Sequence, residues 1–174
     1  DAVVGAAVRQ LQSDGKCSAQ AISKMEAAEF QAYIAKVGFH NTKTKHIKQA
    51  VEILIETYNG DIPPTAADMI RDLPGVGPKM AYICESACWN IQSGIGVDTH
   101  MHRIFNQLHW VNSKTPEQTR VQLQAWLPKE HWGSVNLLFV GFGQECQQFK
   151  PSILRKALEC SRPAEAIRLL KRCG

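Results

Sequence analysis

The sequence of 174 residues lacks several features that would place it in a particular class of protein. It has no apolar run approaching the roughly 20 residues of a membrane-spanning helix. Its first residues show neither the basic segment nor the cleavage motif of a secretory signal. No stretch alternates between polar and apolar residues for long enough to predict a β-strand, and there is no repeat or low-complexity segment. We therefore expect an all-α protein without membrane association.

What the chain contains is a composition suited to a substantial core. Hydrophobic residues make up 44% and charged residues 21% of the sequence, which is typical of globular proteins. Its 20 Lys and Arg against 16 Asp and Glu give a net charge of +4, which permits an anionic partner such as nucleic acid. The six cysteines are scattered, and reduced thiols are favoured over a disulfide framework.

Apolar residues recur at helical spacing along the whole chain. Helix-capping residues and breakers set the expected boundaries, with N-caps at Ser18, Thr65, Asp98 and Thr115. The expected helices cover residues 4–11, 18–25, 30–37, 42–58, 65–72, 78–89, 98–109, 115–127 and 132–142, followed by two short helices after residue 151. Gly141 and Gly143 predict that the helix from Trp132 ends there.

The most informative segment runs from Leu73 to Arg103 and begins with the turn sequence Leu-Pro-Gly-Val-Gly. Gly75 and Gly77 stand between two expected helices, where they allow a tight turn close to another molecule. The amides of such a turn and the next helix N-terminus form an anion site suited to a nucleic-acid phosphate. A turn that only joins two packed helices is the alternative.

Lys79 and Asp98 are the candidate chemical groups of this segment. Lys79 lies in the first turn of the expected helix after the turn. The helix dipole there disfavours an ammonium and favours the neutral amine, which forms a Schiff base with a sugar C1′ or a carbonyl. Asp98, as an N-cap, can stabilise positive charge or accept a proton. A solvated lysine and an ordinary cap are the alternatives.

Two stretches together resemble one known family. Residues 73–81, Leu-Pro-Gly-Val-Gly-Pro-Lys-Met-Ala, and residues 96–104, Gly-Val-Asp-Thr-His-Met-His-Arg-Ile, resemble endonuclease III, a helix-hairpin-helix DNA glycosylase of base-excision repair. Segments 60–63, 78–80, 115–120, 126–128 and 138–144 resemble its eukaryotic, thymine-glycol-type branch. The resemblance, which covers about residues 1–146, implies the HhH-GPD fold, in which two helical lobes flank a DNA cleft. We expect the lobes at 1–95, with the helix-hairpin-helix at 65–90, and at 96–174, with an atypical tail at 146–174.

The resemblance also implies a function. The chain is expected to be a bifunctional DNA glycosylase/AP lyase that removes oxidised pyrimidines from double-stranded DNA, or acts at abasic sites, through a lysine Schiff base and β-elimination. Lys79 matches the family nucleophile, Asp98 the essential aspartate, and Gly75, Val76 and Gly77 the hairpin that grips phosphate. A monomer in the nucleus and/or mitochondrion is implied as well.

Further DNA contacts follow from the loop at residues 37–43, which resembles the family loop beside the flipped nucleotide. Phe39 or His40 would fill the vacated stack, although a core position for Phe39 is equally compatible with the sequence. The remaining candidate DNA-binding residues are Asn41, Lys43, His100 and Arg103, with Lys45 and Lys48 as further phosphate contacts. A solvated helix face explains the three lysines nearly as well.

The chain departs from the family at both ends. Helices that precede the matching region in the family are not found, so we expect a fragment with its N-terminal helices missing. A non-catalytic helix-hairpin-helix DNA-binding module or a truncated, inactive remnant is therefore the alternative function. At the other end, the four closely spaced cysteines of the family's [4Fe–4S] cluster are replaced by Cys146, Cys160 and Cys173. We expect no metal and no cluster, with Cys146 the one remnant ligand.

Two other groups of side chains invite a metal interpretation. Cys84 and Cys88 lie four residues apart on one expected helix without further ligands, which favours packing in the interior. His100 and His102 point apart on a helix, so a zinc site is not expected, and His100 is assigned to the surroundings of Asp98.

Overall fold

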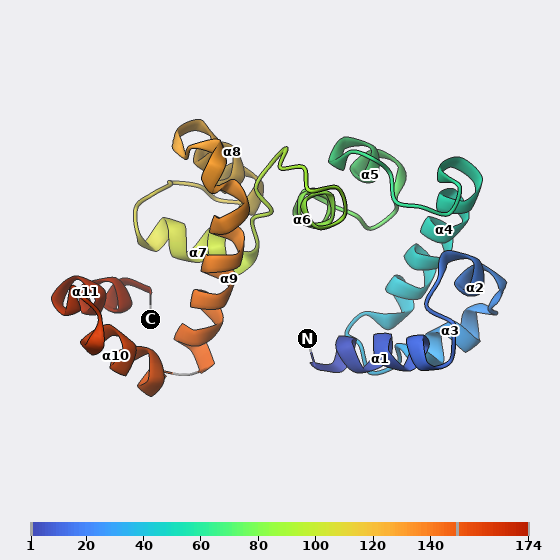
Figure 1. Cartoon of the computed structure of the whole chain (residues 1–174), viewed down its shortest axis with the longest axis horizontal. Helices are drawn as coiled ribbons and strands as arrows, with labels where there is room; N and C mark the ends of the chain where they lie inside the picture. The colour runs from blue at the N-terminus through green and yellow to red at the C-terminus, as the bar shows by residue number, and fades with distance from the viewer. Residues whose placement is uncertain (1, 149, 174) are drawn as a thin grey trace. The chain divides into compact units, whose positions relative to one another are not determined.

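The structure, a computed structural model, describes residues 2–148 and 150–173. Those residues form helices and connecting turns without any β-strand (Figure 1). Within them, no helix is both long and apolar enough to span a membrane. The helices are α1 Ala2–Ser13, α2 Ala19–Lys24, α3 Ala27–Tyr33, α4 His40–Tyr58, α5 Ala66–Asp72, α6 Pro78–Trp89, α7 Thr99–Gln107, α8 Pro116–Trp126, the 3-10 helix Lys129–His131, α9 Trp132–Gln148, α10 Lys150–Glu159 and α11 Pro163–Cys173.

The chain divides into two compact units, Asp1–Gly77 and Pro78–Gly174. This boundary follows the turn of residues 73–77 and precedes α6 directly. It differs from the division into lobes at 1–95 and 96–174 that the resemblance implies, and those lobes stay a prediction. Each unit has its own hydrophobic core.

The first unit is built around α4. Helices α2 and α3 pack on α4, and α1 packs on α3. Helix α1 places Ala7 and Leu11 against the aromatic and aliphatic residues of α3 and the following turn, whereas Val4 and Val8 stay exposed. The resulting core consists of Ala7, Leu11, Met25, Phe30, Ile34 and Val37, with Ile47 of α4 packed against it.

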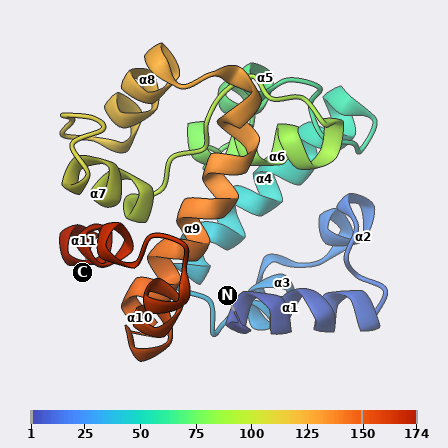
Figure 2. The ribbon, with the colours of Figure 1, turned by 60° about the vertical axis from the view of Figure 1, so that its left-hand side comes forward.

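The second unit is built around α7, which packs on α8 and α9. One core joins the loop before α7 to these three helices and contains Ile95, Val97, Met101, Phe105, Val111, Leu123 and Val135. A second cluster joins α7 and α9 to the helices α10 and α11, which lie beside them (Figure 2). Helix α7 therefore contributes to both clusters.

The cap residues confirm four of the predicted helix starts. The side chains of Ser18, Thr65, Asp98 and Thr115 each accept a hydrogen bond from an amide of the first turn that follows. The predicted end of the helix from Trp132 is wrong, because α9 continues through both glycines to Gln148.

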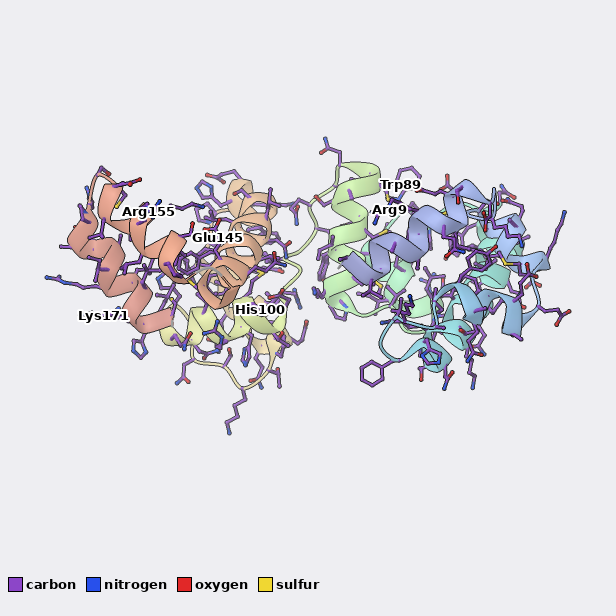
Figure 3. All side chains as sticks on the ribbon, turned by 90° about the horizontal axis from the view of Figure 1, so that it is seen from below. Arg9, Trp89, His100, Glu145, Arg155 and Lys171 are labelled. Carbon is purple, nitrogen blue, oxygen red and sulfur yellow. The ribbon has the colours of Figure 1, made fainter. Side chains whose placement is uncertain are left out.

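The reason that α9 continues lies in its packing. A Cβ at Gly143 would lie 3.1 Å from the Cβ of His100 and 3.3 Å from Cδ1 of Ile104. This glycine therefore lets α9 approach α7 closely, and tertiary packing offsets the roughly 1 kcal/mol by which glycine disfavours a helix. Figure 3 labels His100 on α7 and Glu145, two residues after Gly143, on α9.

Candidate functional site

The predicted turn at residues 73–77 is a tight turn held against α4. The amide of Val76 donates to the carbonyl of Leu73 at 3.2 Å. Pro74 supplies the fixed φ of the second turn position, and Gly75 has a φ of +81° at the third, as a type II turn requires. A Cβ at Gly75 would also overlap the imidazole of His46 on α4. Glycine at this position is thus required by both conformation and space.

The residue before the turn ties α5 to α4. The carboxylate of Asp72 accepts two bonds of 2.7 Å from the guanidinium of Arg71 and a further one from the hydroxyl of Tyr58. The guanidinium, followed by the Tyr58 hydroxyl, lowers the pKa of Asp72 to about 2. The carboxylate therefore stays ionised at neutral pH and holds the start of the turn in place.

Lys79 follows Pro78, the first residue of α6, and its side chain is exposed. Proline suits this position because its missing N–H would have no partner inside the helix. The amine is accessible to a molecule that approaches the N-terminus of α6. The structure thus confirms the predicted place of Lys79 in the first turn of a helix.

Asp98 is the N-cap of α7 and is only 9% exposed. Its Oδ1 accepts a hydrogen bond of 2.7 Å from the amide of Met101. This bond orients the carboxylate, and it occupies one of the two oxygens that the ionised group offers as acceptors. The carboxylate is therefore held in a partly dehydrated place, where its charge acts more strongly than in water.

Gly96 brings the segments of these two residues together. A Cβ at this position would lie 2.9 Å from the carbonyl oxygen of Lys79 and 2.8 Å from Cγ1 of Ile83. The backbone two residues before Asp98 therefore lies against the first turn of α6. Lys79 and Asp98 belong to the same compact unit and to segments that touch.

Phe39 lies at the start of α4 and is 85% exposed, which excludes the core position that the sequence left open. Its φ of +58° is in the left-handed region, which costs a non-glycine residue about 1–2 kcal/mol. The amine of Lys43 donates to the carbonyl of Gly38 at 2.7 Å and so supports the turn. The turn therefore exposes an aromatic side chain to solvent, as the predicted insertion into a base stack requires.

The other predicted DNA-binding residues have differing surroundings. His40 is half-buried at the first position of α4, and the side chain of Asn41 accepts a 2.6 Å bond from that of Gln31. His100 is half-buried on α7. The guanidinium of Arg103 donates to the carbonyl of Cys173 at 2.7 Å, so it connects α7 to α11. Their contacts with DNA stay predictions.

Lys48 has a structural role that the sequence did not indicate. Its amine donates to the carbonyls of Ile22, Ser23 and Met25 at 2.9, 2.8 and 2.6 Å. An ammonium has three N–H donors, and all of them are used at the end of α2. The prediction that Lys48 contacts a phosphate is therefore wrong.

The three tail cysteines lie in different surroundings. Cys146 and Cys173 are buried in the apolar cluster between α7, α9, α10 and α11. Burial, followed by the neighbouring Cys146, raises the pKa of the Cys173 thiol. Cys160 is exposed, and its thiol donates to the carbonyl of Ala157 at 3.1 Å. Among the described residues, no group of three or more His, Cys, Asp or Glu could hold a metal ion.

The cysteine pair on α6 is not packed in the interior as predicted. Cys84 is half-buried and Cys88 is exposed, with their sulfur atoms 3.8 Å apart. Burial, and then the contact with Cys88, raises the pKa of Cys84 to about 11, so its thiol is protonated at neutral pH. His102, the other metal candidate, lies 2.7 Å from the buried hydroxyl of Thr119 through its Nδ1.

Sequence inspection missed the side chains that hold the loop between α6 and α7. The carboxylate of Glu85, only 2% exposed, accepts bonds from the amide and hydroxyl of Ser93, and Asn136 of α9 donates to the carbonyl of Gly96. A carboxylate among the apolar residues of α6 is the signal that was available for Glu85. No local pattern marks Asn136, because its partner is far away in the sequence.

The fold and the site together define a class of protein. The described residues are helical, and a glycine turn joins two of the helices, which is the arrangement of a helix-hairpin-helix protein. The candidate site adds a lysine soon after the turn and an aspartate N-cap. The family model described as HhH-GPD superfamily base excision DNA repair protein matches residues 1–129, and the chain belongs to this superfamily. The predicted fold class and the resemblance to endonuclease III are thereby confirmed.

Individual relatives agree. The endonuclease III homologue of Schizosaccharomyces pombe is 51% identical over 146 residues, which are 83% of this chain and 41% of that protein. The endonuclease III-like protein 1 of Gallus gallus is 47% identical over 147 residues, which are 83% of this chain and 52% of that protein. The chain thus spans about half or less of the length of these relatives.

Two solved structures share the fold. A trapped endonuclease III–DNA covalent intermediate is similar with a TM-score of 0.71 and 26% identity, covering 78% of this chain and 63% of that one. A non-covalent endonuclease III–DNA complex reaches a TM-score of 0.78 at 23% identity, covering 95% of this chain and 74% of that one.

Proposed function

We propose that this protein is a bifunctional DNA glycosylase and AP lyase that acts on oxidised pyrimidines and abasic sites in double-stranded DNA. The observation that carries the proposal is the close approach of Gly96 to the carbonyl oxygen of Lys79. This approach brings the segment with the exposed Lys79 amine next to the segment with the buried Asp98 carboxylate. The names of the relatives and the covalent DNA complex of the solved endonuclease III support the same reaction.

In the proposed reaction, the neutral amine of Lys79 attacks C1′ of a nucleotide flipped out of the duplex. The bond between C1′ and the base nitrogen breaks with its electron pair on the base, which takes a proton from solvent. The bond between C1′ and O4′ then breaks, O4′ takes the proton that Nζ has given up to Asp98, and a protonated Schiff base joins Nζ to C1′. Loss of a proton from C2′ forms a double bond to C3′ and breaks the bond from C3′ to its phosphate oxygen, which is the lyase step.

Asp98 supplies the charge that this sequence needs. Its carboxylate stabilises the cationic character that develops at C1′ and in the Schiff base, and it serves as a proton acceptor for the attacking amine. The N-cap bond to Met101 fixes the carboxylate in advance. Little reorganisation is then required as the charge develops.

The remaining parts of the proposed site bind DNA. The turn of Gly75, Val76 and Gly77 holds a phosphate through the amides of the two glycines, since the amide of Val76 donates to the carbonyl of Leu73. Phe39 enters the stack at the flipped nucleotide. The exposure of Phe39 on a supported turn favours this role. We further propose that the protein acts without a [4Fe–4S] cluster, because two of the three tail thiols belong to an apolar core.

Borohydride trapping tests the proposed reaction. The reagent reduces a Schiff base to a stable amine and so links protein to DNA covalently. We expect trapping on duplexes that contain thymine glycol or an abasic site. The variant Lys79→Ala should lose trapping by a factor on the order of 10³ or more, and Asp98→Asn by about 10². Lys171→Ala, which removes an exposed lysine on α11, is the matched control and should trap like the unchanged protein.

Two outcomes contradict the proposal. Equal trapping by Lys79→Ala and the unchanged protein would show that another amine forms the Schiff base. Salt-dependent binding to duplex DNA without trapping on either substrate would instead identify a non-catalytic binding module.

A further inference from the structure

Asn136 contacts the backbone on one side of Asp98 and a side chain on the other. Its Nδ2 donates a hydrogen bond to the carbonyl of Gly96, two residues before Asp98. The same atom lies 3.5 Å from Sδ of Met101, the residue whose amide caps onto the Asp98 carboxylate. The half-buried side-chain amide of Asn136, on α9, therefore contacts one residue before and one residue after the N-cap Asp98.

The segment that Asn136 holds is the one that rests on Lys79. Gly96 lies against the carbonyl oxygen of Lys79 on one side and receives the Asn136 amide on its own carbonyl. The backbone at Gly96 is thus fixed between α6 and α9. A shift of this peptide would move Asp98 relative to Lys79.

Two further bonds hold the same loop from other helices. Glu85 of α6 accepts from the amide of Ser93 at 3.3 Å, and Gln124 of α8 accepts from the amide of Ile95 at 3.1 Å. These two bonds act on amides before Gly96, whereas the bond from Asn136 acts on its carbonyl. Of these three hydrogen bonds, the one from Asn136 therefore lies nearest to Asp98 along the chain.

We propose that Asn136 is a positioning residue, whose amide N–H sets the Gly96–Asp98 segment so that the carboxylate keeps its place beside the Schiff base of Lys79. This inference rests on the proposed function. Asn136 acts through the backbone and does not itself touch DNA in the proposal. Misplacement of a reacting group by about 1 Å lowers a rate by about 10²-fold, which sets the size of the expected effect.

The variants Asn136→Asp and Asn136→Leu separate positioning from packing. Both share the branching of asparagine at Cγ, aspartate with nearly the same volume and leucine with a larger one. An ionised aspartate cannot donate to the Gly96 carbonyl, and leucine never can. A protonated aspartic acid can donate through its O–H. Since this carboxyl would be half-buried and face a carbonyl, its pKa would rise above the ordinary value of about 3.9.

The measurement is the rate of borohydride trapping on an abasic duplex, with protein in excess, over a series of pH values. We expect both variants to trap on the order of 10–100-fold more slowly than the unchanged protein near neutral pH. As the pH falls, the deficit of Asn136→Asp should shrink and that of Asn136→Leu should persist. The titratable and charged groups near this segment include Lys79, Tyr82, Glu85, Asp98 and Arg120. They are common to all three proteins, so the ratio of rates isolates position 136.

Gln122→Leu provides the matched control. Gln122 of α8 also bonds to backbone, at 2.8 Å to both the amide and the carbonyl of Asn112, in the same compact unit. Its loss should lower the free energy of unfolding without slowing trapping by folded protein. Should Asn136→Leu fail to fold, Asn136→Ala replaces it in the same series.

The outcomes are distinguishable from failure of the proposed function. If the unchanged protein traps and the Asn136 variants, once folded, trap equally fast, the positioning role is wrong while the function stands. Equal and pH-independent deficits in both variants would likewise overturn it, since they indicate packing alone. Absence of trapping by the unchanged protein would overturn both proposals.

Discussion

At the residue scale, neighbouring lysines on α4 serve different purposes. Lys43 supports the turn that exposes Phe39. The ammonium of Lys48 uses all three of its N–H groups in hydrogen bonds to the carbonyls at the end of α2. Lys45 is exposed. Charge alone therefore does not distinguish a lysine that holds the fold from one that faces an anionic ligand.

This difference leads to a prediction for Lys48→Met, which keeps the aliphatic stem and removes the charge. We expect the free energy of unfolding to fall by about 2 kcal/mol, because hydrogen bonds from a charged group are lost from partly buried carbonyls. The salt dependence of duplex binding should stay unchanged. Denaturant unfolding and DNA titrations at several salt concentrations measure these two quantities.

Lys45→Met is the control for that prediction. It should change the free energy of unfolding by no more than about 0.5 kcal/mol. If Lys45 contacts a phosphate, the slope of log K against log salt should fall by about one. A smaller slope for Lys48→Met would contradict the role that the structure gives to its amine.

At the element scale, α9 shows why helix ends are hard to predict from sequence. Gly141 and Gly143 occupy the middle of a helix that runs from Trp132 to Gln148. Gly143 permits the close approach to α7, whereas a Cβ at Gly141 would meet nothing within 4 Å. The same residue type thus allows close packing at one position and is replaceable two residues away.

The two glycines therefore give a matched pair of variants. Gly141→Ala should raise the free energy of unfolding by up to about 1 kcal/mol, because alanine favours the helix and fits the space. Gly143→Leu should lower it by about 1–3 kcal/mol, because the side chain would press on His100 and Ile104. Urea unfolding measures both, and shifts in the same direction would contradict the packing described for α7 and α9.

At the scale of the whole molecule, the tail after α9 is held by ordinary protein contacts. Cys146, Ile153 and Cys173 pack with Ile104 and Leu108 of α7, and Arg103 donates to the carbonyl of Cys173. Lys156 of α10 forms a 2.7 Å ion pair with Glu145 of α9. In the part of the tail that the structure describes, these residues form an apolar core closed by polar contacts.

Metal analysis tests that arrangement. We expect purified protein to contain no stoichiometric iron, and a chelator to leave its Tm unchanged. Cys146→Ala should lower the free energy of unfolding by about 1 kcal/mol through the space it leaves, with trapping by folded protein retained. Iron with the visible absorption of an iron–sulfur cluster, lost in Cys146→Ala, would show that the tail thiols do bind a cluster.

The helices, their caps and the turn at residues 73–77 could be predicted from the sequence because their causes are local. A cap side chain bonds to amides of the next turn, and Pro74 and Gly75 impose their own backbone angles. The same segments carry Lys79 and Asp98, so the candidate site and the family were visible in the sequence as well.

Tertiary structure alone decided how those parts are held. Several contacts join residues that lie far apart in the chain. They are the contact of Gly96 with Lys79, the hydrogen bond from Asn136 to Gly96, the hydrogen bonds from Lys48 to the end of α2, the packing of Gly143 on α7 and the burial of Cys146. No local pattern encodes them, because each depends on which surfaces pack together. Local sequence therefore accounts for the elements and the reactive groups, whereas packing between distant segments accounts for their places.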